Sequence, residues 1–165
     1  MLRTAFARLR SHGRLHAEGR VRIGRGVRFH LTPGAEVTLA RGARIGAGTR
    51  FHVQGHARIG PNATLGERCV IAAHERVEVG AGAHLDDEVV LIDFDHGVGD
   101  VERPIRLQGL VTSPVVIGEH AVLAAGATVL RGVEVGAGAR VQPRAVVTRD
   151  VAAGATVAGV PARPV

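Results

Sequence analysis

Hydrophobic residues recur at every sixth position between residues 115 and 147. The anchors of this repeat are Ile117, Leu123, Val129, Val135, Val141 and Val147. A helix repeats about every 3.6 residues and a half-buried strand every second residue, so neither pattern explains a six-residue interval. A short strand followed by a turn does explain it, provided that successive units stack coil upon coil. The repeat therefore predicts a parallel β-helix built from hexapeptides.

The same interval continues toward the N-terminus in groups of three, with slips of register between the groups. These triplets are Leu39, Ile45 and Phe51, then Ile59, Leu65 and Ile71, then Val79, Leu85 and Leu91, after a ragged start at Ile23 and Phe29. Three strands in each coil predict a triangular prism, and about six coils at the spacing between strands give a height of about 30 Å. The expected fold is all-β, with ladders of Val, Ile and Leu inside the column.

Residues 1–18 stand apart from this repeat. Leu2, Phe6 and Leu9 fall near one face of a helix, whereas arginines fall elsewhere, which predicts a short amphipathic helix. We expect this segment to be a helical cap that covers the open end of the column and its strand edges. A basic segment that touches a membrane surface is the alternative. A single β-helix domain is expected over residues 19–165.

The composition is that of one domain with a sizeable core, because 45% of the 165 residues are hydrophobic. No apolar run is long enough to span a membrane, and the basic start of the chain has no apolar signal core. We therefore expect no integral membrane segment and a cytoplasmic location. The single cysteine, Cys69, excludes an internal disulfide. It lies two residues before the inward-facing Ile71 and is interpreted as a small core residue.

The basic residues argue against a nucleic-acid partner, although the net charge is +6. All 21 are arginines spread along the chain, and only 2% of the residues are aromatic, so bases would find no stacking platforms. The lack of lysine also excludes Schiff-base chemistry. The two serines, Ser11 and Ser113, lie outside any G-x-S-x-G nucleophile motif.

One long insertion, at residues 93–114, interrupts the repeat, and it is rich in Gly, Pro and charged residues. It begins with Asp93, Asp95 and His96, shortly after the inward-facing Leu91. A histidine titrates near neutrality and can take a proton from a hydroxyl, while a neighbouring carboxylate can hold its tautomer. The alternative is a solvated turn in which the two aspartates cap backbone amides. The local residues favour the two interpretations equally.

Three motifs, in order, give the sequence a resemblance to a known family. They are LIDFDH at residues 91–96, the run VVIGEHAVLAAGATVLRGVEVGAGARV from residue 115, and AVVTRDV followed by AGVPARPV at the end. Over roughly residues 20–165 the chain resembles the hexapeptide-repeat acetyltransferases, in the sugar and capsule O-acetyltransferase branch related to maltose and galactoside acetyltransferases. The resemblance implies a left-handed β-helix, a homotrimer and acetyl-CoA bound between neighbouring columns, with no metal required.

The resemblance also implies catalytic roles. His96 matches the family's general base, which removes the proton of an acceptor hydroxyl as that oxygen attacks the thioester directly. Asp93 or Asp95 would orient the imidazole. The implied acceptor is a small molecule or glycan, a sugar or a carbohydrate-related compound, and an amine acceptor stays open. His74, near a coil corner, is interpreted as an acceptor-binding residue across from His96.

Five residues match positions at which relatives hold the acyl donor. They are Ala125, Pro143, Thr148, Arg149 and Arg163. A backbone N–H near Ala125 would stabilise the oxyanion of the tetrahedral intermediate. The planar guanidinium groups of Arg149 and Arg163 would bind the pantetheine or phosphate part of the donor.

The sequence departs from the family's pattern around the donor positions. Val122 replaces a common Trp, Ala124 and Ala125 replace the usual Gly and the Gly or Ser, and Arg131 in LRGV replaces a proline. The usual GAG before the AVVTRDV segment is QPR at residues 142–144. These changes leave room for an acyl group other than acetyl, and they do not affect His96.

Two other functions stay open. Three histidines from neighbouring columns would suit zinc, as in the gamma-class carbonic anhydrases that share this fold, and His52 and His56 have the spacing nearest to a ligand pair. A noncatalytic trimeric β-helix that serves as a scaffold or binds polysaccharide is the third hypothesis. The polar insertion and the terminal GVPAR motif argue against that scaffold. His30, His84 and His120 are interpreted as exposed corner residues.

Overall fold

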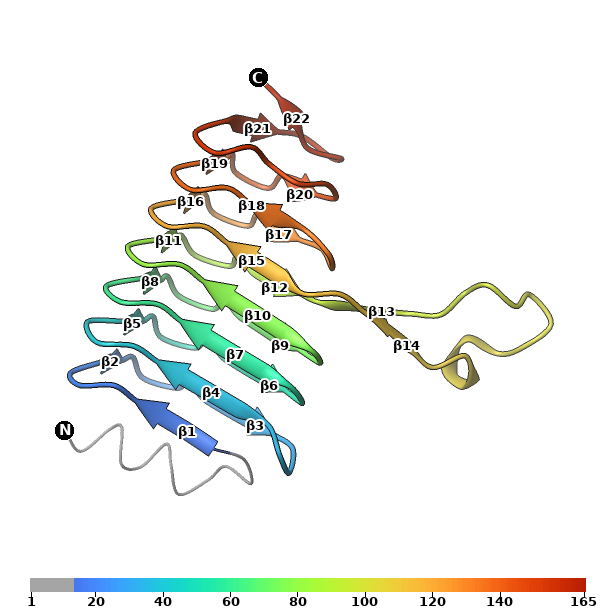
Figure 1. Cartoon of the computed structure of the whole chain (residues 1–165), viewed down its shortest axis with the longest axis horizontal. Helices are drawn as coiled ribbons and strands as arrows, with labels where there is room; N and C mark the ends of the chain where they lie inside the picture. The colour runs from blue at the N-terminus through green and yellow to red at the C-terminus, as the bar shows by residue number, and fades with distance from the viewer. Residues whose placement is uncertain (1–13) are drawn as a thin grey trace.

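Each coil of the chain contributes one short strand to each of three sheets, and these sheets form the faces of a triangular column (Figure 1). The computed structural model describes residues 14–165. Neighbouring strands within the column pair in parallel, apart from the last pair. The left-handed parallel β-helix expected from the sequence is confirmed, with seven parallel strands in its longest sheet where about six coils were expected.

The three sheets run the length of the column. The first sheet contains β1 (Arg14–Ala17), β4 (Glu36–Leu39), β7 (His56–Ile59), β10 (Arg76–Val79), β15 (Val115–Ile117) and β18 (Glu134–Val135). The second contains β2 (Arg22–Ile23), β5 (Arg44–Ile45), β8 (Thr64–Leu65), β11 (His84–Leu85), β16 (Val122–Leu123), β19 (Arg140–Val141), β21 (Thr156–Ala158) and β22 (Arg163–Pro164). The third contains β3 (Arg28–Leu31), β6 (Arg50–Val53), β9 (Val70–Ala73), β12 (Val90–Ile92), β17 (Thr128–Val129) and β20 (Val146–Val147).

The inward side chains form ladders, because parallel pairing places equivalent residues of successive coils above one another. In the third sheet Phe29, Phe51 and Ile71 are in register, and the rings of Phe29 and Phe51 stack with their centroids 4.8 Å apart. Every anchor of the six-residue repeat is buried except Ile23 and Phe29 of the first coil, which are partly buried. The hydrophobic pattern therefore predicted the core correctly.

The coils approach one another closely at their corners, and this is why small residues stand between the anchors. A Cβ atom on Gly46 would overlap the carbonyl oxygen of Gly66 in the next coil, so no larger residue fits there. Cys69 is buried beside such a corner, as expected, and its thiol donates to the carbonyl oxygen of Asp86 at 3.2 Å.

The column begins earlier than the sequence predicted. Residues 1–13, most of the expected helical cap, lie outside the described residues, but Arg14–Ala17 form β1 and not the end of a helix. Leu15 pairs with Val37 and is buried, whereas the residues on either side of it are exposed. Such alternation with a period of two is typical of a strand, and burial of Leu15 on the ladder favours it here.

The insertion at residues 93–114 leaves the column as a projecting two-stranded arm (Figure 1). Its strands β13 (Phe94–His96) and β14 (Leu110–Thr112) pair antiparallel, and the loop between them contains the short 3-10 helix η1 (Ile105–Leu107). At the base of the arm the N–H of Ser113 donates to the carbonyl oxygen of Asp93 at 2.9 Å. The arm thus leaves the third sheet after β12 and returns to the first sheet at β15.

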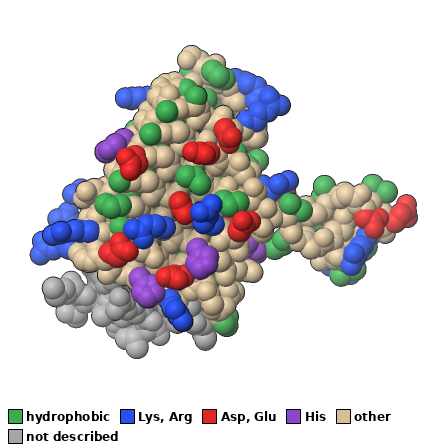
Figure 2. Space-filling model, in the orientation of Figure 1, with side chains coloured by type: hydrophobic (Ala, Val, Ile, Leu, Met, Phe, Trp, Pro, Cys, Tyr) green, Lys and Arg blue, Asp and Glu red, His purple; other side chains and the backbone are tan. Residues whose placement is uncertain are grey.

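Charged and apolar side chains are distributed differently over the surface. Figure 2 shows both signs of charge interspersed on one face of the column. On β10, Arg76 and Glu78 form an exposed pair at 3.2 Å. Such exposed pairs contribute little stability. The arm carries charges of both signs as well, and it also exposes large apolar side chains, among them Val98 at 67% and Val101 at 91%. Within residues 14–165, no helix has the length and apolar character needed to cross a membrane.

Candidate functional site

His96 lies on the projecting arm, where β13 places it opposite Leu110 of β14. The residue is exposed, and its backbone N–H donates to Oδ1 of Asp95 at 2.7 Å. Among residues 14–165, no carboxylate is hydrogen-bonded to the imidazole itself. A general base must come within hydrogen-bond reach of the proton that it removes, and an exposed imidazole on a projecting strand is accessible to a substrate.

Asp93 has the opposite environment, although only two residues separate it from His96. It is fully buried, and its carboxylate accepts three backbone N–H groups, from His74 at 2.7 Å, Glu75 at 2.8 Å and Arg76 at 2.6 Å. These bonds satisfy the buried carboxylate. Asp93 therefore holds the base of the arm to the loop before β10, which leaves Asp95 as the aspartate that contacts His96.

His74 lies between the arm and the third sheet. Its ring stacks on Phe94 of β13 with the centroids 3.8 Å apart, and its Nε2 atom is 3.2 Å from Nε2 of Gln54. Since Asp93 also binds the N–H of His74, two residues of the arm contact it. The predicted acceptor-binding residue is thus adjacent to the strand that carries His96.

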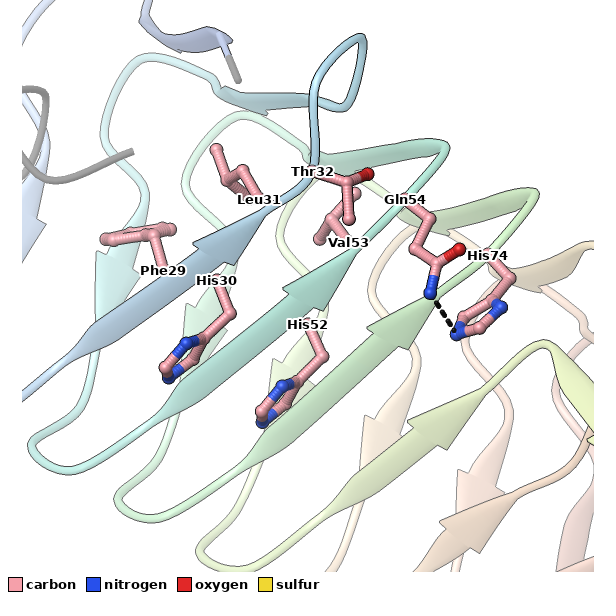
Figure 3. Close-up of a pocket in the computed structure, with 8 residues that line it drawn as sticks. All are labelled: Phe29, His30, Leu31, Thr32, His52, Val53, Gln54 and His74. Carbon is pink, nitrogen blue, oxygen red and sulfur yellow. Dashed lines mark hydrogen bonds between the residues drawn. The ribbon is translucent and has the colours of Figure 1, made fainter. Parts of the chain in front are cut away.

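A pocket of about 420 Å³ opens next to His74 on the outer face of the third sheet (Figure 3). Its polar lining consists of His30, Thr32, His52, Gln54 and His74, and we call it the histidine pocket. The rings of His30 and His52 are almost parallel, with centroids 4.9 Å apart. Burial lowers the pKa of His52, and the neighbouring His30 and Arg50 lower it further. At neutral pH the His52 imidazole is therefore uncharged.

A second cavity, of about 290 Å³, lies at the C-terminal end of the column and brings Arg149 and Arg163 together. Both arginines are exposed, and the walls between them include the apolar residues Val147 and Val157. Asp150 also lines this cavity, and its carboxylate accepts the N–H of Glu134 at 2.8 Å. The two guanidinium groups can bind phosphate groups bidentately. Thr148 is exposed beside Arg149 but does not line this cavity.

Ala125 and Pro143 lie on successive coils at a different corner of the column. The N–H of Arg144, next to Pro143, donates to the carbonyl oxygen of Ala125 at 2.9 Å, and all three residues are exposed. Within the described part of the chain the N–H of Ala125 donates to no acceptor. This N–H can therefore donate to the oxyanion of the tetrahedral intermediate, which is the role expected of an N–H near Ala125.

The described residues offer no ligand set for the zinc alternative. Over residues 14–165, no three side chains among His, Cys, Asp and Glu converge on one point. His52 points from the third sheet into the histidine pocket, whereas His56 lies on β7 of the first sheet, 3.9 Å from Glu36. Their spacing of four residues spans a corner, so the two imidazoles lie on different faces of the column.

The sequence did not single out the histidine pocket. From the sequence we interpret His30 as an exposed corner residue, and we assign no role to Thr32 or Gln54. In the structure His30 pairs with His52 one coil further on, and Thr32 and Gln54 line the same pocket. The coil length could have predicted these contacts, because residues 22 apart in this part of the chain lie above one another.

The column and its repeat define the class of protein. A profile described as bacterial transferase hexapeptide (six repeats) matches residues 114–149. This match and the left-handed β-helix show that the chain is similar to the hexapeptide-repeat transferases.

Individual relatives refine the comparison. A probable acetyltransferase of Mycobacterium tuberculosis is 33% identical over 149 residues, which are 89% of this chain and 50% of that protein. Among solved structures, a mutant of AntD, an N-acyltransferase from Bacillus cereus in complex with dTDP and coenzyme A, has a TM-score of 0.78 at 14% identity, covering 98% of this chain and 86% of that chain. A maltose O-acetyltransferase from Clostridium difficile has a TM-score of 0.57 at 20% identity, covering 99% of this chain and 73% of that chain.

These similarities differ in what they establish. At 14% and 20% identity the two structures share the fold with this chain. The chain spans half the length, or less, of the curated relatives that it matches. The similarity to hexapeptide-repeat transferases therefore rests on the repeat and the column, and the activity has to be argued from the residues.

Proposed function

We propose that this protein is an acyltransferase that moves an acetyl group from acetyl-CoA to a hydroxyl of a sugar or carbohydrate-related acceptor. The observation that carries the proposal is the presence, on one column, of an exposed His96 on the arm and of two arginines around the C-terminal cavity. Acyl transfer from CoA needs a base for the acceptor and cationic groups for the donor's phosphates. The name of the mycobacterial relative, a probable acetyltransferase, supports the same class. A CoA-dependent reaction also fits the cytoplasmic location expected from the sequence.

The proposed reaction is a direct attack without an acyl-enzyme. The His96 imidazole takes the proton of the acceptor hydroxyl as that oxygen attacks the thioester carbonyl. The tetrahedral intermediate carries a negative charge, which a backbone N–H such as that of Ala125 would stabilise. The intermediate collapses to the ester, and the departing CoA sulfur receives the proton from the imidazolium. Asp95, which already binds the backbone N–H of His96, is the residue proposed to orient it.

Homotrimerisation is part of the proposal, because the arm projects away from its own column (Figure 1). Apolar side chains on the arm, among them Val101 at 91%, Ile105 at 53% and Leu107 at 51%, are exposed in a single chain. An exposed apolar cluster of this kind is typical of a protein interface. Three columns side by side would cover the arms and bring His96 of one chain to the donor site of the next, where Ala125, Pro143, Thr148, Arg149 and Arg163 would hold acetyl-CoA.

Calorimetric titration with CoA tests the donor site. We expect saturable binding to the wild-type protein, and about tenfold weaker binding to Arg149→Ala and to Arg163→Ala, because each loses a charge-assisted bond to phosphate. Arg22→Ala is the control, since Arg22 is an exposed arginine on β2, near the other end of the column. Equal weakening by all three variants would mean that net charge, and not the C-terminal cavity, binds the nucleotide.

Turnover with acetyl-CoA and a panel of saccharides tests the base. We expect His96→Ala to lower kcat by about two to four orders of magnitude, the usual contribution of a general base, while CoA binding is unchanged. His84→Ala is the matched control, because His84 is an exposed histidine of the second sheet that pairs with Asp86 at 2.9 Å. Near-normal turnover of His96→Ala would refute the assignment. Stoichiometric zinc in a protein that does not bind CoA would support the carbonic-anhydrase-like alternative instead.

A further inference from the structure

Two rows of side chains cross the outer face of the third sheet and end at the arm. Parallel pairing puts His30, His52 and Ala72 in register, and the row continues to Ile92 of β12. Two imidazoles thus project next to each other on adjacent strands, and Figure 3 shows them pointing the same way. The row becomes apolar where the arm begins.

The second row lies beside the first and leads directly to the arm. Gln54 and His74 are in contact, with their Nε2 atoms 3.2 Å apart, and Thr32 occupies the corresponding position on the coil below (Figure 3). The ring of His74 stacks on Phe94, which lies two residues before His96 on β13. An unbroken set of contacts therefore connects the floor of the histidine pocket to the strand that carries the proposed base.

The chemistry of this lining selects an uncharged, hydroxyl-rich ligand. Among residues 14–165, no Asp, Glu, Lys or Arg lines the histidine pocket, and the polar groups of its lining are one hydroxyl, one amide and three imidazoles. Each of these groups both donates and accepts hydrogen bonds when neutral, as sugar hydroxyls also do. The lowered pKa of His52 keeps that ring neutral near pH 7. Arg28 and Arg50 pair on the same two strands, two residues before His30 and His52, but they do not line the pocket.

The length of the surface indicates a chain and not a single sugar. Thr32, Gln54, His74 and Phe94 are contributed by four successive coils, and coils are spaced by about 4.8 Å, so the row spans roughly 14 Å. We propose that the histidine pocket is an extended acceptor subsite that binds neutral sugar residues of an oligosaccharide whose terminal hydroxyl reaches His96. This inference rests on the proposed function for its link to catalysis, but binding of the glycan itself does not require CoA.

Binding of the full chain, without CoA, to an array of immobilised oligosaccharides of increasing length tests the subsite. The array carries neutral glycans and sialylated or sulfated ones. We expect neutral oligosaccharides to bind better than their monosaccharides. We expect His52→Ala and Gln54→Ala each to weaken that binding about five- to tenfold, the effect of losing one hydrogen bond. His56→Ala is the matched control, since His56 is an exposed histidine of the same coil on the first sheet, outside the pocket.

The outcomes separate this inference from the proposed function. Binding of charged glycans only, no neutral binding, or equal binding by all variants would overturn the subsite, whatever the CoA titration gives. Loss of the assembled state in His52→Ala or Gln54→Ala, seen by sedimentation, would also overturn it, because a second copy of the chain would then cover the pocket. Variant-sensitive neutral binding in a protein that does not bind CoA would support the pocket and refute the transferase.

Discussion

Cys69 shows what burial does to a titratable side chain in this column. Its thiol is fully buried and donates to the carbonyl oxygen of Asp86 at 3.2 Å. Burial raises the pKa of the thiol from 9.0 to about 11, because the thiolate would lose its hydration inside the core. The folded protein therefore keeps a neutral thiol at pH values at which the unfolded chain carries a thiolate.

We predict that the free energy of unfolding falls as the pH rises from about 9 to about 11. The unfolded thiol ionises first, so alkaline pH favours the unfolded chain, by about 1 kcal/mol at about pH 10. The sequence has no lysine and no tyrosine, so no other side chain titrates in this range. Urea unfolding at about pH 8 and pH 10 should show this loss in the wild type but not in Cys69→Ala. The same loss in both proteins would place its source elsewhere.

The arm carries His96, on which the candidate chemistry depends. The buried carboxylate of Asp93 fixes the point where the arm leaves the column. Asp93 accepts the N–H groups of three consecutive residues, 74 to 76, and thereby ties β13 to the loop before β10. The sequence grouped Asp93 with Asp95 and His96 because they are neighbours along the chain. Their side chains have different surroundings, since one is buried at the corner of the column and the other two are exposed.

We predict that Asp93→Ala lowers the free energy of unfolding by about 2 to 4 kcal/mol, because it removes charge-assisted bonds to three N–H groups. Asp95→Ala is the control for stability, since Asp95 is exposed and binds one N–H, and it should cost well under half as much. Chemical denaturation of the three proteins measures the difference. A fully stable Asp93→Asn variant with a strongly reduced kcat would show, in contrast, that Asp93 acts on His96 directly.

The whole molecule has one rigid column and one projecting arm, and these two parts have unlike surfaces. Charges of both signs are scattered over the column and the arm in Figure 2, but the arm also exposes Val98, Val101, Ile105 and Leu107. A β-helix adds coils without creating new lateral contacts, because each coil binds only its neighbours. We therefore expect chains to associate through the arm, which would place an active site between two chains.

We predict that the protein sediments as a trimer and that Val101→Asp combined with Ile105→Asp shifts it toward monomer. The reason is that a charge at an apolar interface must lose its hydration when the interface closes. Val165→Asp is the control, since Val165 is 81% exposed and lies at the C-terminal end, away from the arm. Sedimentation velocity measures the masses. A wild-type monomer, or a trimer that tolerates both charges on the arm, would contradict the proposed assembly.

The six-residue interval was enough to predict the column. The six-residue interval predicted parallel coils and named the buried anchors, because a stacked coil has one inward position per strand and that position must be apolar. It also predicted where the column is interrupted, and it identified His96 and the two arginines as candidates. Phe51, Leu91 and Ile117 are each buried as the interval requires.

Which polar residues meet could be read only from the folded chain. Asp93 turns into the corner and binds amides, His30 stacks on His52 one coil away, and Arg149 and Arg163 share a cavity. Outward-facing positions do not have to be apolar, so the hydrophobic pattern does not predict what occupies them. Their neighbours in space lie on the next coil, about one coil length away in sequence. That length is 22 residues from Phe29 to Phe51 but 18 from Ile117 to Val135, so contacts between coils depend on corners that the repeat does not encode.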